Sequence, residues 1–259
     1  MFEEFKNKTI FITGAASGMG RAAALRFGAL GAKVAVAARN TAGGNETVRL
    51  IRESGGTAEF VRCDVSIDEE VRAAVAETVE LFGSLDYAFN NAGCGADGVH
   101  IPFAPLTEVT EDDWCRVINT NLTGVFHCLK YELQQMNRQG SGAIVNTSSI
   151  GGLKMAPEFG AYGPSKAAVI AVTQTAAVEN AKNGIRVNAI CPGPTMGTGL
   201  MDASLASGTQ DPAFMEAHVI PQGKMGTTDE IVDGVVFLCS SLSSHITGAV
   251  LPVCGGMQM

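Results

Sequence analysis

The sequence predicts an α/β fold built on a parallel β-sheet, and three observations lead to this expectation. Short apolar, β-branched runs alternate with longer helical patterns along almost the whole chain, which is the pattern of repeated βαβ units. The runs are continuously apolar, as expected for strands that are covered on both faces. No low-complexity linker interrupts the pattern. We therefore expect a single Rossmann-like, doubly wound domain over residues 1–259, with a seven-stranded parallel sheet flanked by helices on both faces.

The expected strands and helices follow one another in near-strict alternation. Strands are predicted at 9–13, 33–38, 58–63, 85–90, 143–148, 185–190 and 249–253. Helices are predicted at 19–30, 43–54, 67–82, 111–137, 162–182 and 228–240. The crossovers that join parallel strands in this way are right-handed. Because the strands are parallel, their carboxyl ends all lie at one edge of the sheet.

The turn after the first strand is rich in glycine. It consists of Gly14, Ser17, Gly18, Met19 and Gly20 with two intervening alanines, and it leads into a helix. Glycines allow the backbone to approach a pyrophosphate, which then lies on the first N–H groups and the positive dipole end of the helix. The spacing differs from the standard dinucleotide fingerprint, because three residues and then one separate the glycines. The placement between strand and helix nevertheless predicts a dinucleotide site.

The end of the second strand bears on the choice between NAD(H) and NADP(H). An acidic residue at this position would accept hydrogen bonds from the adenosine ribose hydroxyls and repel a 2′-phosphate. Here Ala38 is followed by Arg39 and Asn40, and a guanidinium can bind a phosphate bidentately. We therefore expect NADP(H) to be preferred over NAD(H). The alternative is that Arg39 merely faces solvent.

The third and fourth strand ends carry further candidate cofactor contacts. Asp64 and Val65 follow the third strand, where the carboxylate could accept from the adenine amino group or cap the helix that starts near residue 67. Asn91, Ala92 and Gly93 follow the fourth strand. These small residues suit the close approach of a ribose or phosphate, although Asn and Gly are also ordinary turn residues.

The segment around Tyr162 carries the candidate catalytic chemistry. Ser148 and Ser149 end a predicted strand, and Tyr162 and Lys166 lie four residues apart at the start of a helix, on one face of it. An ammonium ~4 Å from the phenol would favour the phenolate by ~4 kcal/mol at an effective dielectric of ~20. This would lower the pKa of Tyr162 by about three units from ~10. The alternative is an ordinary surface Tyr and Lys.

Taken together, these features resemble the short-chain dehydrogenase/reductase family over nearly the whole chain. The matching motifs are Thr13-Gly14-xxx-Gly18-x-Gly20, Asn90-Asn91-Ala92-Gly93, Asn121 in NLTGVF, Ser149, Tyr162-xxx-Lys166 and Pro192-Gly193. Ser149 lies thirteen residues before Tyr162, the family separation, so it is preferred over Ser148 as the catalytic hydroxyl. The resemblance implies an NAD(P)-dependent oxidoreductase that interconverts a secondary alcohol and a ketone.

The resemblance also implies a role for each residue of a catalytic tetrad. Tyr162 would be the general acid in reduction and the general base in oxidation, and Lys166 would lower its pKa and bind the nicotinamide ribose. Ser149 would hold the substrate oxygen. Asn121 would order a water that passes protons through Lys166, with the alternative that Asn121 only kinks its helix.

The last cofactor contacts implied by the resemblance follow the sixth strand. Pro192 and Gly193, with Thr195 or Thr198, would meet the nicotinamide amide, although Thr198 could be an ordinary loop hydroxyl. Two positions depart from the family pattern. Ser17 stands where an NADP-specific subset has a basic residue, and Cys254 replaces an acid in LPVCGG.

Substrate choice in such folds lies in loops beyond the strand ends. Three are long here, at 94–105, 151–161 and 194–224, and the last is expected to be a substrate lid. Its apolar side chains suggest an apolar cyclic or steroid-like substrate, or else they pack the lid onto the body. Two rival functions are a 3-oxoacyl-(acyl-carrier-protein) reductase and a non-catalytic dinucleotide-binding protein.

Charge and composition limit the partners. A net charge of −8 and the absence of a basic run argue against nucleic acid or an anionic membrane as partner. The N-terminal MFEEFKNK has no apolar segment of a signal peptide. Seven cysteines without CxxC spacing favour a cytoplasmic protein with neither disulfides nor a metal site. The resemblance implies a homotetramer, or at least a homodimer, through helices 111–137 and 162–182.

Overall fold

The computed structural model describes residues 3–257, and its main element is a seven-stranded sheet in the order β3-β2-β1-β4-β5-β6-β9. All neighbouring strands are parallel. The strands are β1 (Thr9–Thr13), β2 (Lys33–Ala38), β3 (Thr57–Arg62), β4 (Tyr87–Asn90), β5 (Gly142–Thr147), β6 (Ile185–Pro192) and β9 (Val250–Val253). A separate two-stranded pair consists of β7 (Thr195–Met196) and β8 (Gly226–Thr227).

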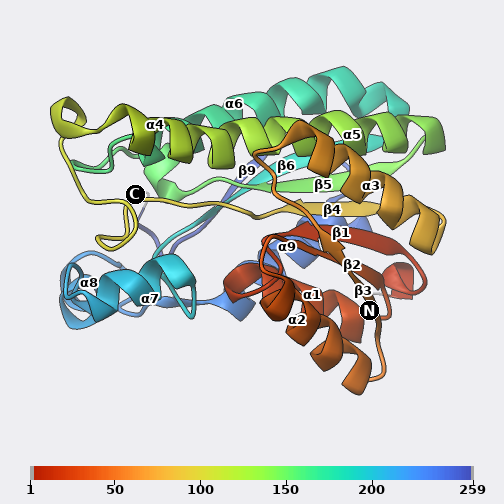
Figure 1. Cartoon of the computed structure of the whole chain (residues 1–259), viewed down its shortest axis with the longest axis horizontal. Helices are drawn as coiled ribbons and strands as arrows, with labels where there is room; N and C mark the ends of the chain where they lie inside the picture. Colours follow the sequence, from red (N-terminus) through yellow and green to blue (C-terminus); the bar gives the residue numbers. More distant parts are fainter. Residues whose placement is uncertain (1–2, 258–259) are drawn as a thin grey trace.

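Helices cover both faces of this sheet (Figure 1). They are α1 (Gly18–Ala29), α2 (Thr41–Glu53), α3 (Asp68–Phe82), α4 (Glu111–Ile118), α5 (Gly124–Gln139), α6 (Tyr162–Asn180), α7 (Gly199–Ala206), α8 (Pro212–His218) and α9 (Thr228–Cys239). Buried side chains of α1, α2 and α9 form one core, and those of α3, α5 and α6 form the other. The predicted fold class is therefore confirmed.

The strand order reverses between β1 and β4. The chain winds from β1 outward to β3, and then from β4 outward to β9. In such sheets, ligands bind at the carboxyl ends of the strands where the direction of winding changes. Thr13 and Asn90 end the two strands at this point, and the Thr13 Oγ1 accepts hydrogen bonds from the backbone N–H groups of Asn91 (3.0 Å) and Ala92 (3.1 Å).

The helical stretch predicted at 111–137 contains a π-helical turn. It comprises α4, a π-helical turn η3 (Asn119–Thr123) and α5. The predicted helical stretch is therefore confirmed, and the π-helical turn within it was not predicted. Asn121 lies within it and is fully buried, with its side-chain amide bonded to neighbouring backbone and side-chain groups, so polar contacts accompany the local widening of the helix.

The segment predicted to be a lid, 194–224, contains two helices that the sequence pattern did not predict, α7 and α8. Thr198 and Asp211 begin them by accepting hydrogen bonds from backbone N–H groups of the first turn. Figure 1 shows both helices at one end of the sheet, away from the N-terminus. Among residues 3–257, every helix is too short or too polar to span a bilayer.

Candidate active site

Tyr162 and Lys166 lie at the start of α6, beside the end of β5. The Lys166 Nζ donates a 2.9 Å hydrogen bond to the Thr147 carbonyl oxygen and lies 5.8 Å from the centroid of the Tyr162 ring. Lys166 is buried, whereas Tyr162 is partly exposed. The expectation that both side chains share one face of the helix is therefore met.

The two serines after β5 have different surroundings. The Ser148 hydroxyl is buried and donates to the Lys166 carbonyl oxygen at 2.7 Å. The Ser149 Oγ accepts from the Gly151 N–H at 3.0 Å and forms a hydrogen bond that lowers the pKa of Tyr162. The structure thus places Ser149, the serine preferred from the sequence, beside the Tyr162 phenol.

The electrostatics of this pair differ from the expectation. Burial raises the pKa of Tyr162 above its ordinary value, and the hydrogen bond to Ser149 offsets this only in part. Burial also lowers the pKa of Lys166 to about 8. The predicted net lowering of the Tyr162 pKa is therefore wrong, because burial raises this pKa by more than the hydrogen bond to Ser149 lowers it. In this environment the phenol holds its proton at neutral pH and can act as an acid.

Asn121 links three segments of the site. Its Oδ1 accepts from the Cys94 N–H at 2.8 Å, and its Nδ2 donates to the Cys94 carbonyl oxygen at 2.7 Å and to the Ser165 Oγ at 3.1 Å. A Cβ added at Gly93 would lie 3.2 Å from the Asn121 Oδ1 and 3.3 Å from the Lys166 Nζ. The Asn121 amide therefore lies within the group that contains Lys166.

The glycine-rich turn packs closely against the turn after β4. Gly14 has a φ of +67°, and a Cβ added there would lie 3.0 Å from the Ala92 Cα. A Cβ at Gly20 would lie 2.3 Å from the Gly14 carbonyl oxygen, so only glycine fits. Within the described chain, the Ser17 side chain forms no capping hydrogen bond with α1. The first N–H groups of α1 are therefore free of a side-chain cap, as an anion site requires.

The residues after β2 and β3 lie close together. The Arg39 side chain is 67% exposed, and its Nη1 lies 3.5 Å from the Asp64 Oδ2. Asn40 caps α2 by accepting from the Gly43 N–H at 3.0 Å. The Asp64 Oδ1 accepts from the backbone N–H and hydroxyl of Ser66. Although burial opposes it, these bonds and the charge of Arg39 hold the Asp64 pKa below its ordinary value.

Asp64 does not cap the helix that follows it, because the residue at the N-cap of α3 is Ile67, so that alternative is wrong. Neighbouring Val65 is buried, and its carbonyl oxygen is 2.9 Å from the His127 Nδ1. Met19 is partly buried and packs on the core formed by α1, α2 and α9.

The turn after β6 is held by threonine hydroxyls and by Cys254. The Thr195 Oγ1 donates to the Gly193 carbonyl oxygen at 2.8 Å, and the Thr198 Oγ1 donates to the Thr195 carbonyl oxygen at 3.0 Å. Thr198 also caps α7, so its structural role is established. A Cβ added at Gly193 would lie 2.8 Å from the Cys254 Cα. Cys254, which departs from the family pattern, thus packs against the backbone of Gly193.

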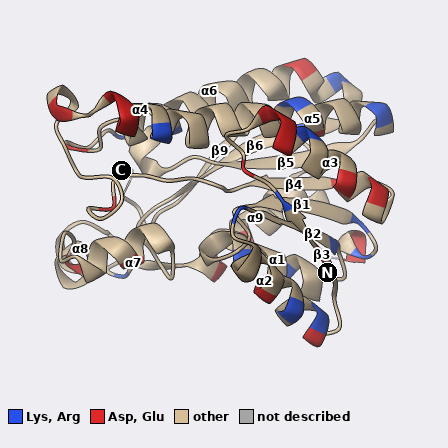
Figure 2. Cartoon of the chain, viewed as in Figure 1, with Lys and Arg blue, Asp and Glu red and all other residues tan. Residues whose placement is uncertain are grey.

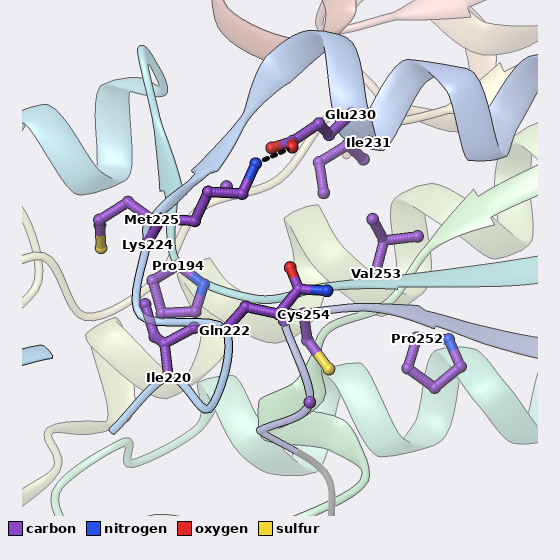
Figure 3. A pocket seen from close by; sticks show the side chains of 13 residues that line it. Pro194, Ile220, Gln222, Lys224, Met225, Glu230, Ile231, Pro252, Val253 and Cys254 are labelled. Atoms are coloured by element: carbon purple, nitrogen blue, oxygen red, sulfur yellow. Dashed lines mark hydrogen bonds and ion pairs between the residues drawn. The ribbon is translucent and has the colours of Figure 1, made fainter. Parts of the chain in front are cut away.

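A cavity of about 410 Å³ lies at this end of β6 and β9, and Figure 3 shows the side chains that line it. Pro194, Gln222 and Cys254 line it, and an ion pair between Lys224 and Glu230 closes one wall. A smaller cavity of about 50 Å³ reaches Tyr162, and its lining includes Phe159 and other apolar residues as well as Glu108 and Asp113. The Phe159 and Tyr162 rings meet edge to face, with centroids 6.0 Å apart.

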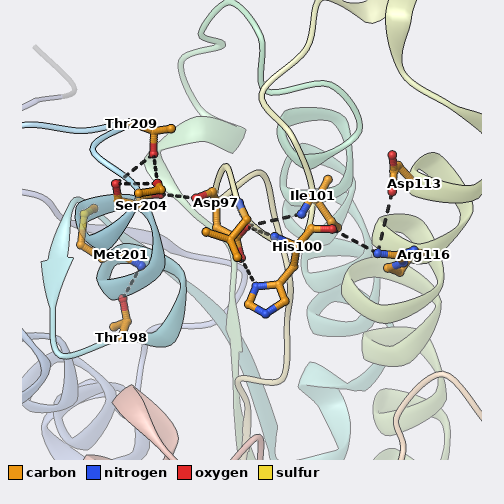
Figure 4. Close-up of polar contacts among 11 residues, drawn as sticks. Asp97, His100, Ile101, Asp113, Arg116, Thr198, Met201, Ser204 and Thr209 are labelled. Atoms are coloured by element: carbon orange, nitrogen blue, oxygen red, sulfur yellow. Dashed lines mark hydrogen bonds and ion pairs between the residues drawn. The ribbon is translucent and has the colours of Figure 1, made fainter.

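A polar network that the sequence pattern did not reveal joins the loop after β4 to α7 (Figure 4). Asp97 is buried, its Oδ1 accepts from the backbone N–H groups of Val99 and His100, and its Oδ2 lies 2.8 Å from the His100 Nδ1. The Ser204 hydroxyl donates to the Asp97 carbonyl oxygen at 3.1 Å. The Asp97-Gly98 pair could have suggested a local turn from the sequence. No local pattern predicts that Ser204 on α7 is its partner.

Several residues in or beside the site orient its groups without having been predicted to do so. The Thr147 carbonyl oxygen and the Ser165 hydroxyl bind Lys166 and Asn121. A Cβ added at Gly95 would lie 2.5 Å from the Tyr162 ring, so the loop after β4 packs directly on the phenol. These contacts join segments far apart in the sequence, and only the glycine gave a local signal.

The site also passes a structural test for a dinucleotide. The Asn91 Oδ1 and the Thr147 Oγ1 are buried and have no hydrogen-bond partner within residues 3–257. Both lie beside the uncapped start of α1 or the tetrad, at the carboxyl edge of the sheet. Buried polar atoms without partners are costly, and the hydroxyls and amide of a dinucleotide would supply such partners. The donor set and the glycine turns therefore fit a nicotinamide dinucleotide.

The fold and this site define a dinucleotide-dependent oxidoreductase, and comparisons with known proteins agree. The family model described as enoyl-(acyl carrier protein) reductase matches residues 14–258. The chain is 38% identical over 254 residues to 2,5-dichloro-2,5-cyclohexadiene-1,4-diol dehydrogenase of Sphingobium indicum, covering 98% of each chain. It is 37% identical over 257 residues to 3-oxoacyl-(acyl-carrier-protein) reductase FabG of Staphylococcus epidermidis, covering 98% of this chain and 100% of that one.

Among solved structures, NAD+-bound xylitol dehydrogenase superposes with a TM-score of 0.90 at 37% identity, covering 98% of this chain and 100% of that one. The chain belongs to the short-chain dehydrogenase/reductase family. It is an oxidoreductase that acts on CH–OH groups with a nicotinamide dinucleotide cofactor. The alternative of a non-catalytic dinucleotide-binding protein is therefore wrong.

Proposed function

We propose that the protein interconverts a secondary alcohol and a ketone with Tyr162 as the proton-transferring residue. The contact among Ser149, Tyr162 and Lys166 at the end of β5 is the observation that carries this proposal. The nicotinamide cofactor supplies hydride chemistry when bound. In the reducing direction Tyr162 donates its proton to the substrate oxygen, and in the oxidising direction it accepts one.

The remaining residues support this proton transfer. Ser149 holds the substrate oxygen beside the phenol, and Lys166, with a pKa lowered to about 8, exchanges protons near neutral pH. Asn121 fixes the loop at Cys94 and positions the group around Lys166. The residues proposed to bind the cofactor are Gly14, Ser17, Gly18, Met19, Gly20, Arg39, Asn40, Asp64, Val65, Asn91, Ala92, Gly93, Tyr162, Lys166, Pro192, Gly193, Thr195 and Thr198.

Replacement of the phenol hydroxyl tests the proposal. Tyr162→Phe should lower kcat by about 10²–10⁴-fold, the usual contribution of general acid–base catalysis. Tyr131→Phe is a matched control, because Tyr131 lies on α5 and its hydroxyl binds Asp68. Cofactor titration should show that Tyr162→Phe still binds the dinucleotide. Turnover of Tyr162→Phe at the wild-type rate would contradict the proposal.

The cofactor proposed is NADP(H) in preference to NAD(H). Arg39 follows β2 with an exposed guanidinium, and no carboxylate precedes it at the strand end. Its partner Asp64 lies 3.5 Å away, which is a long contact for an ion pair and leaves most of the guanidinium free to bind a 2′-phosphate. The NAD+ in the related xylitol dehydrogenase makes NAD(H) the rival.

This preference is tested by comparing both cofactors with one variant. Arg39→Ala should raise the KM for NADPH about 10-fold or more, because a charge-assisted contact worth ~1.5–3 kcal/mol is lost, and should change the KM for NADH little. Arg49→Ala is the control, since Arg49 is paired with Glu46 and Glu53 on the surface of α2. Equal effects on both cofactors would contradict the proposed 2′-phosphate contact.

The substrate proposed is an apolar cyclic or steroid-like alcohol or ketone. Met155, Met196 and Phe214 are exposed by 55%, 41% and 56% in the two loops around the site, and Phe159 packs on the Tyr162 ring. Other apolar residues of the lid, Met201 among them, instead pack in its own small core. The related cyclohexadienediol dehydrogenase supports a cyclic substrate. A higher kcat/KM for small polar hydroxy acids than for cyclic ketones would contradict it.

A 3-oxoacyl-(acyl-carrier-protein) reductase is the second candidate, favoured by the description of the family model and by the staphylococcal relative. An acidic carrier would require a basic surface at the mouth of the site. Figure 2 shows few charged residues of either sign on α7 and α8, and Lys224 is already paired with Glu230. NADPH oxidation with acetoacetyl thioesters, compared with cyclic ketones, distinguishes the two functions.

We propose a homotetramer, or at least a homodimer, that forms through α4, α5 and α6. Trp114, Phe126 and Val178, one on each helix, are exposed by 38%, 51% and 81%, and such exposed apolar side chains are typical of interfaces. Sedimentation at micromolar concentration should give a dimer or tetramer. A monomer there would contradict the assembly.

The chain as a whole is proposed to be one domain in the cytoplasm, with 194–224 as its substrate lid. All seven cysteines are free thiols in the structure, which suits a reducing compartment. A single cooperative unfolding transition, together with activity that survives excess thiol reductant, is expected. Separate transitions for two parts of the chain would contradict the one-domain proposal.

A further inference from the structure

Glu132 is a buried acid that the proposed reaction does not use. It lies on α5 with no exposed surface, and its Oε2 accepts a 2.9 Å hydrogen bond from the Asn90 Nδ2. Among residues 3–257, Asn90 is its only hydrogen-bond partner and no Lys, Arg or His forms an ion pair with it. An isolated carboxylate in such a place would carry a large desolvation cost.

A chain of hydrogen bonds runs from Glu132 across the sheet to α6. The Asn90 Nδ2 also donates to the Asn146 Oδ1 at 2.9 Å, and the Asn146 Nδ2 donates to the Thr173 Oγ1 at 2.9 Å. The Thr173 hydroxyl donates onward to the Val169 carbonyl oxygen at 2.6 Å. Asn90 and Asn146 are direct neighbours in the pairing of β4 with β5. Both N–H bonds of the Asn90 amide are thus in use.

In the pair formed by Glu132 and Asn90, two oxygen atoms are left without a hydrogen-bond donor. The Asn90 Oδ1 and the Glu132 Oε1 are buried and have no hydrogen-bond partner in the described part of the chain. An amide oxygen and an ionised carboxylate are both acceptors only, so they cannot satisfy one another. A protonated carboxyl supplies the one missing donor, and a planar acid and a planar amide can then pair through two parallel hydrogen bonds.

We propose that Glu132 is a neutral carboxylic acid that donates its Oε1 proton to the Asn90 Oδ1, and that this acid–amide pair positions the ends of β4 and β5. Asn90 immediately precedes Asn91, at the cofactor turn. Asn146 immediately precedes Thr147, whose carbonyl oxygen holds the Lys166 ammonium. The positioning role rests on the proposed function, whereas the protonation state of Glu132 does not.

The surroundings of Glu132 are consistent with its neutrality. Burial raises its pKa to about 8, and the bond from Asn90 only partly offsets this. The titratable groups that face it are the Cys63 thiol after β3 and the Cys128 thiol on α5, and burial raises the pKa values of both. These thiols are neutral at pH 7, so among the described residues no charge of either sign is positioned to ionise Glu132.

Infrared difference spectroscopy tests the protonation state directly. The wild-type spectrum minus that of Glu132→Gln at pH 6.5 should contain one carbonyl-stretching band of a protonated carboxylic acid, which is separate from carboxylate bands. Glu77→Gln on the exposed face of α3 is the matched control and should lose carboxylate absorption only. Absence of the acid band in the Glu132 difference spectrum would overturn the proposal.

Rescue by glutamine tests the pairing with Asn90. The new side-chain amide in Glu132→Gln can donate to the Asn90 Oδ1 and accept from its Nδ2. This variant should therefore keep kcat/KM within about threefold, since both hydrogen bonds are retained. Glu132→Leu should lose activity and lower the urea midpoint. If Glu132→Leu does not fold, the glutamine variant and the infrared band remain decisive. A glutamine variant as unstable as the leucine variant would overturn the pairing.

The pH dependence of stability separates this proposal from a merely structural role. The folded pKa of Glu132, about 8, lies above its unfolded value of ~4.3. Its stabilising contribution is therefore complete below pH ~4.3 and is lost as the pH rises to about 8. The urea midpoint of the wild type should fall relative to Glu132→Gln across this range. Parallel midpoints would overturn the proposal, and wild-type turnover in Tyr162→Phe would refute the proposed function alone.

Discussion

Lys166→Met should change how the stability of the protein depends on pH. The lysine side chain is buried, and only its bond to the Thr147 carbonyl oxygen at 2.9 Å holds the ammonium among the hydrogen bonds of the described residues. Methionine has nearly the same length and shape but carries no charge to desolvate. The substitution removes one titratable group and leaves the packing of α6 on β5 almost unchanged.

The magnitude follows from the lowered pKa. Burial brings the pKa of Lys166 to about 8, against ~10.4 for a lysine in the unfolded chain. At 1.36 kcal/mol per unit, this difference corresponds to about 3 kcal/mol. Because the folded pKa is depressed, the contribution to stability is present above pH ~10.4 and is lost as the pH falls to about 8. At pH 7 the buried ammonium therefore lowers the free energy of unfolding of the wild type by the whole ~3 kcal/mol. At pH 10 most of this destabilisation is gone.

Urea unfolding between pH 7 and pH 10 measures this effect. The free energy of unfolding of Lys166→Met minus that of the wild type should shrink by about 2–3 kcal/mol as the pH rises over this range. The lost hydrogen bond to Thr147 shifts this difference by about 1 kcal/mol at every pH. The test therefore depends on how the difference changes with pH and not on its absolute value. Lys6→Met, at an exposed site, controls for loss of a surface charge. A pH-independent difference for Lys166→Met would refute the reasoning.

Two further substitutions test the cofactor turn and the lid. Gly20→Ala should raise the KM for the dinucleotide about 10-fold or more and cost about 1–3 kcal/mol of stability, because its Cβ would lie 2.3 Å from the Gly14 carbonyl oxygen. Gly199→Ala, with nothing within 4 Å, is the control, and equal effects would contradict the clash. Ser204→Ala removes the 3.1 Å bond from α7 to the Asp97 carbonyl oxygen and should raise the substrate KM about 3–10-fold while kcat changes little. Unchanged steady-state kinetics would show that this bond does not hold the lid.

The sheet and its order of elements could be predicted from the sequence because their signals are local. The strand TIFIT is fully buried, and its apolar run is visible without knowledge of its neighbours. The glycines of the first turn are likewise a local signal, since a positive φ at Gly14 demands that residue type. The predicted strand ends were off by one or two residues, as at β3 and β4, because the ends of strands depend on the pairing partner.

The π-helical turn at Asn121 and the two helices within 194–224 were not predictable in this way. The π-helical turn coincides with hydrogen bonds from Asn121 to Cys94 and Ser165, residues that are distant in the sequence. In segment 194–224, α7 and α8 are short, and isolated helices of this length are unstable in water. Their stability comes from packing around Met201, and a sequence pattern does not show which distant side chains complete such a core.

The sign of the Tyr162 pKa shift shows most clearly what sequence reasoning lacks. Spacing alone placed an ammonium on the same helix face and predicted a net attraction. In the structure the Lys166 Nζ is 5.8 Å from the Tyr162 ring centroid and donates its hydrogen bond to the Thr147 carbonyl oxygen instead. Burial raises the Tyr162 pKa and at the same time lowers that of Lys166, so the ammonium that should stabilise a phenolate is itself partly discharged near pH 8. Desolvation depends on every atom around the pair, and for that reason the sequence could indicate Tyr162 as a candidate proton-transferring residue but could not predict the direction of its pKa shift.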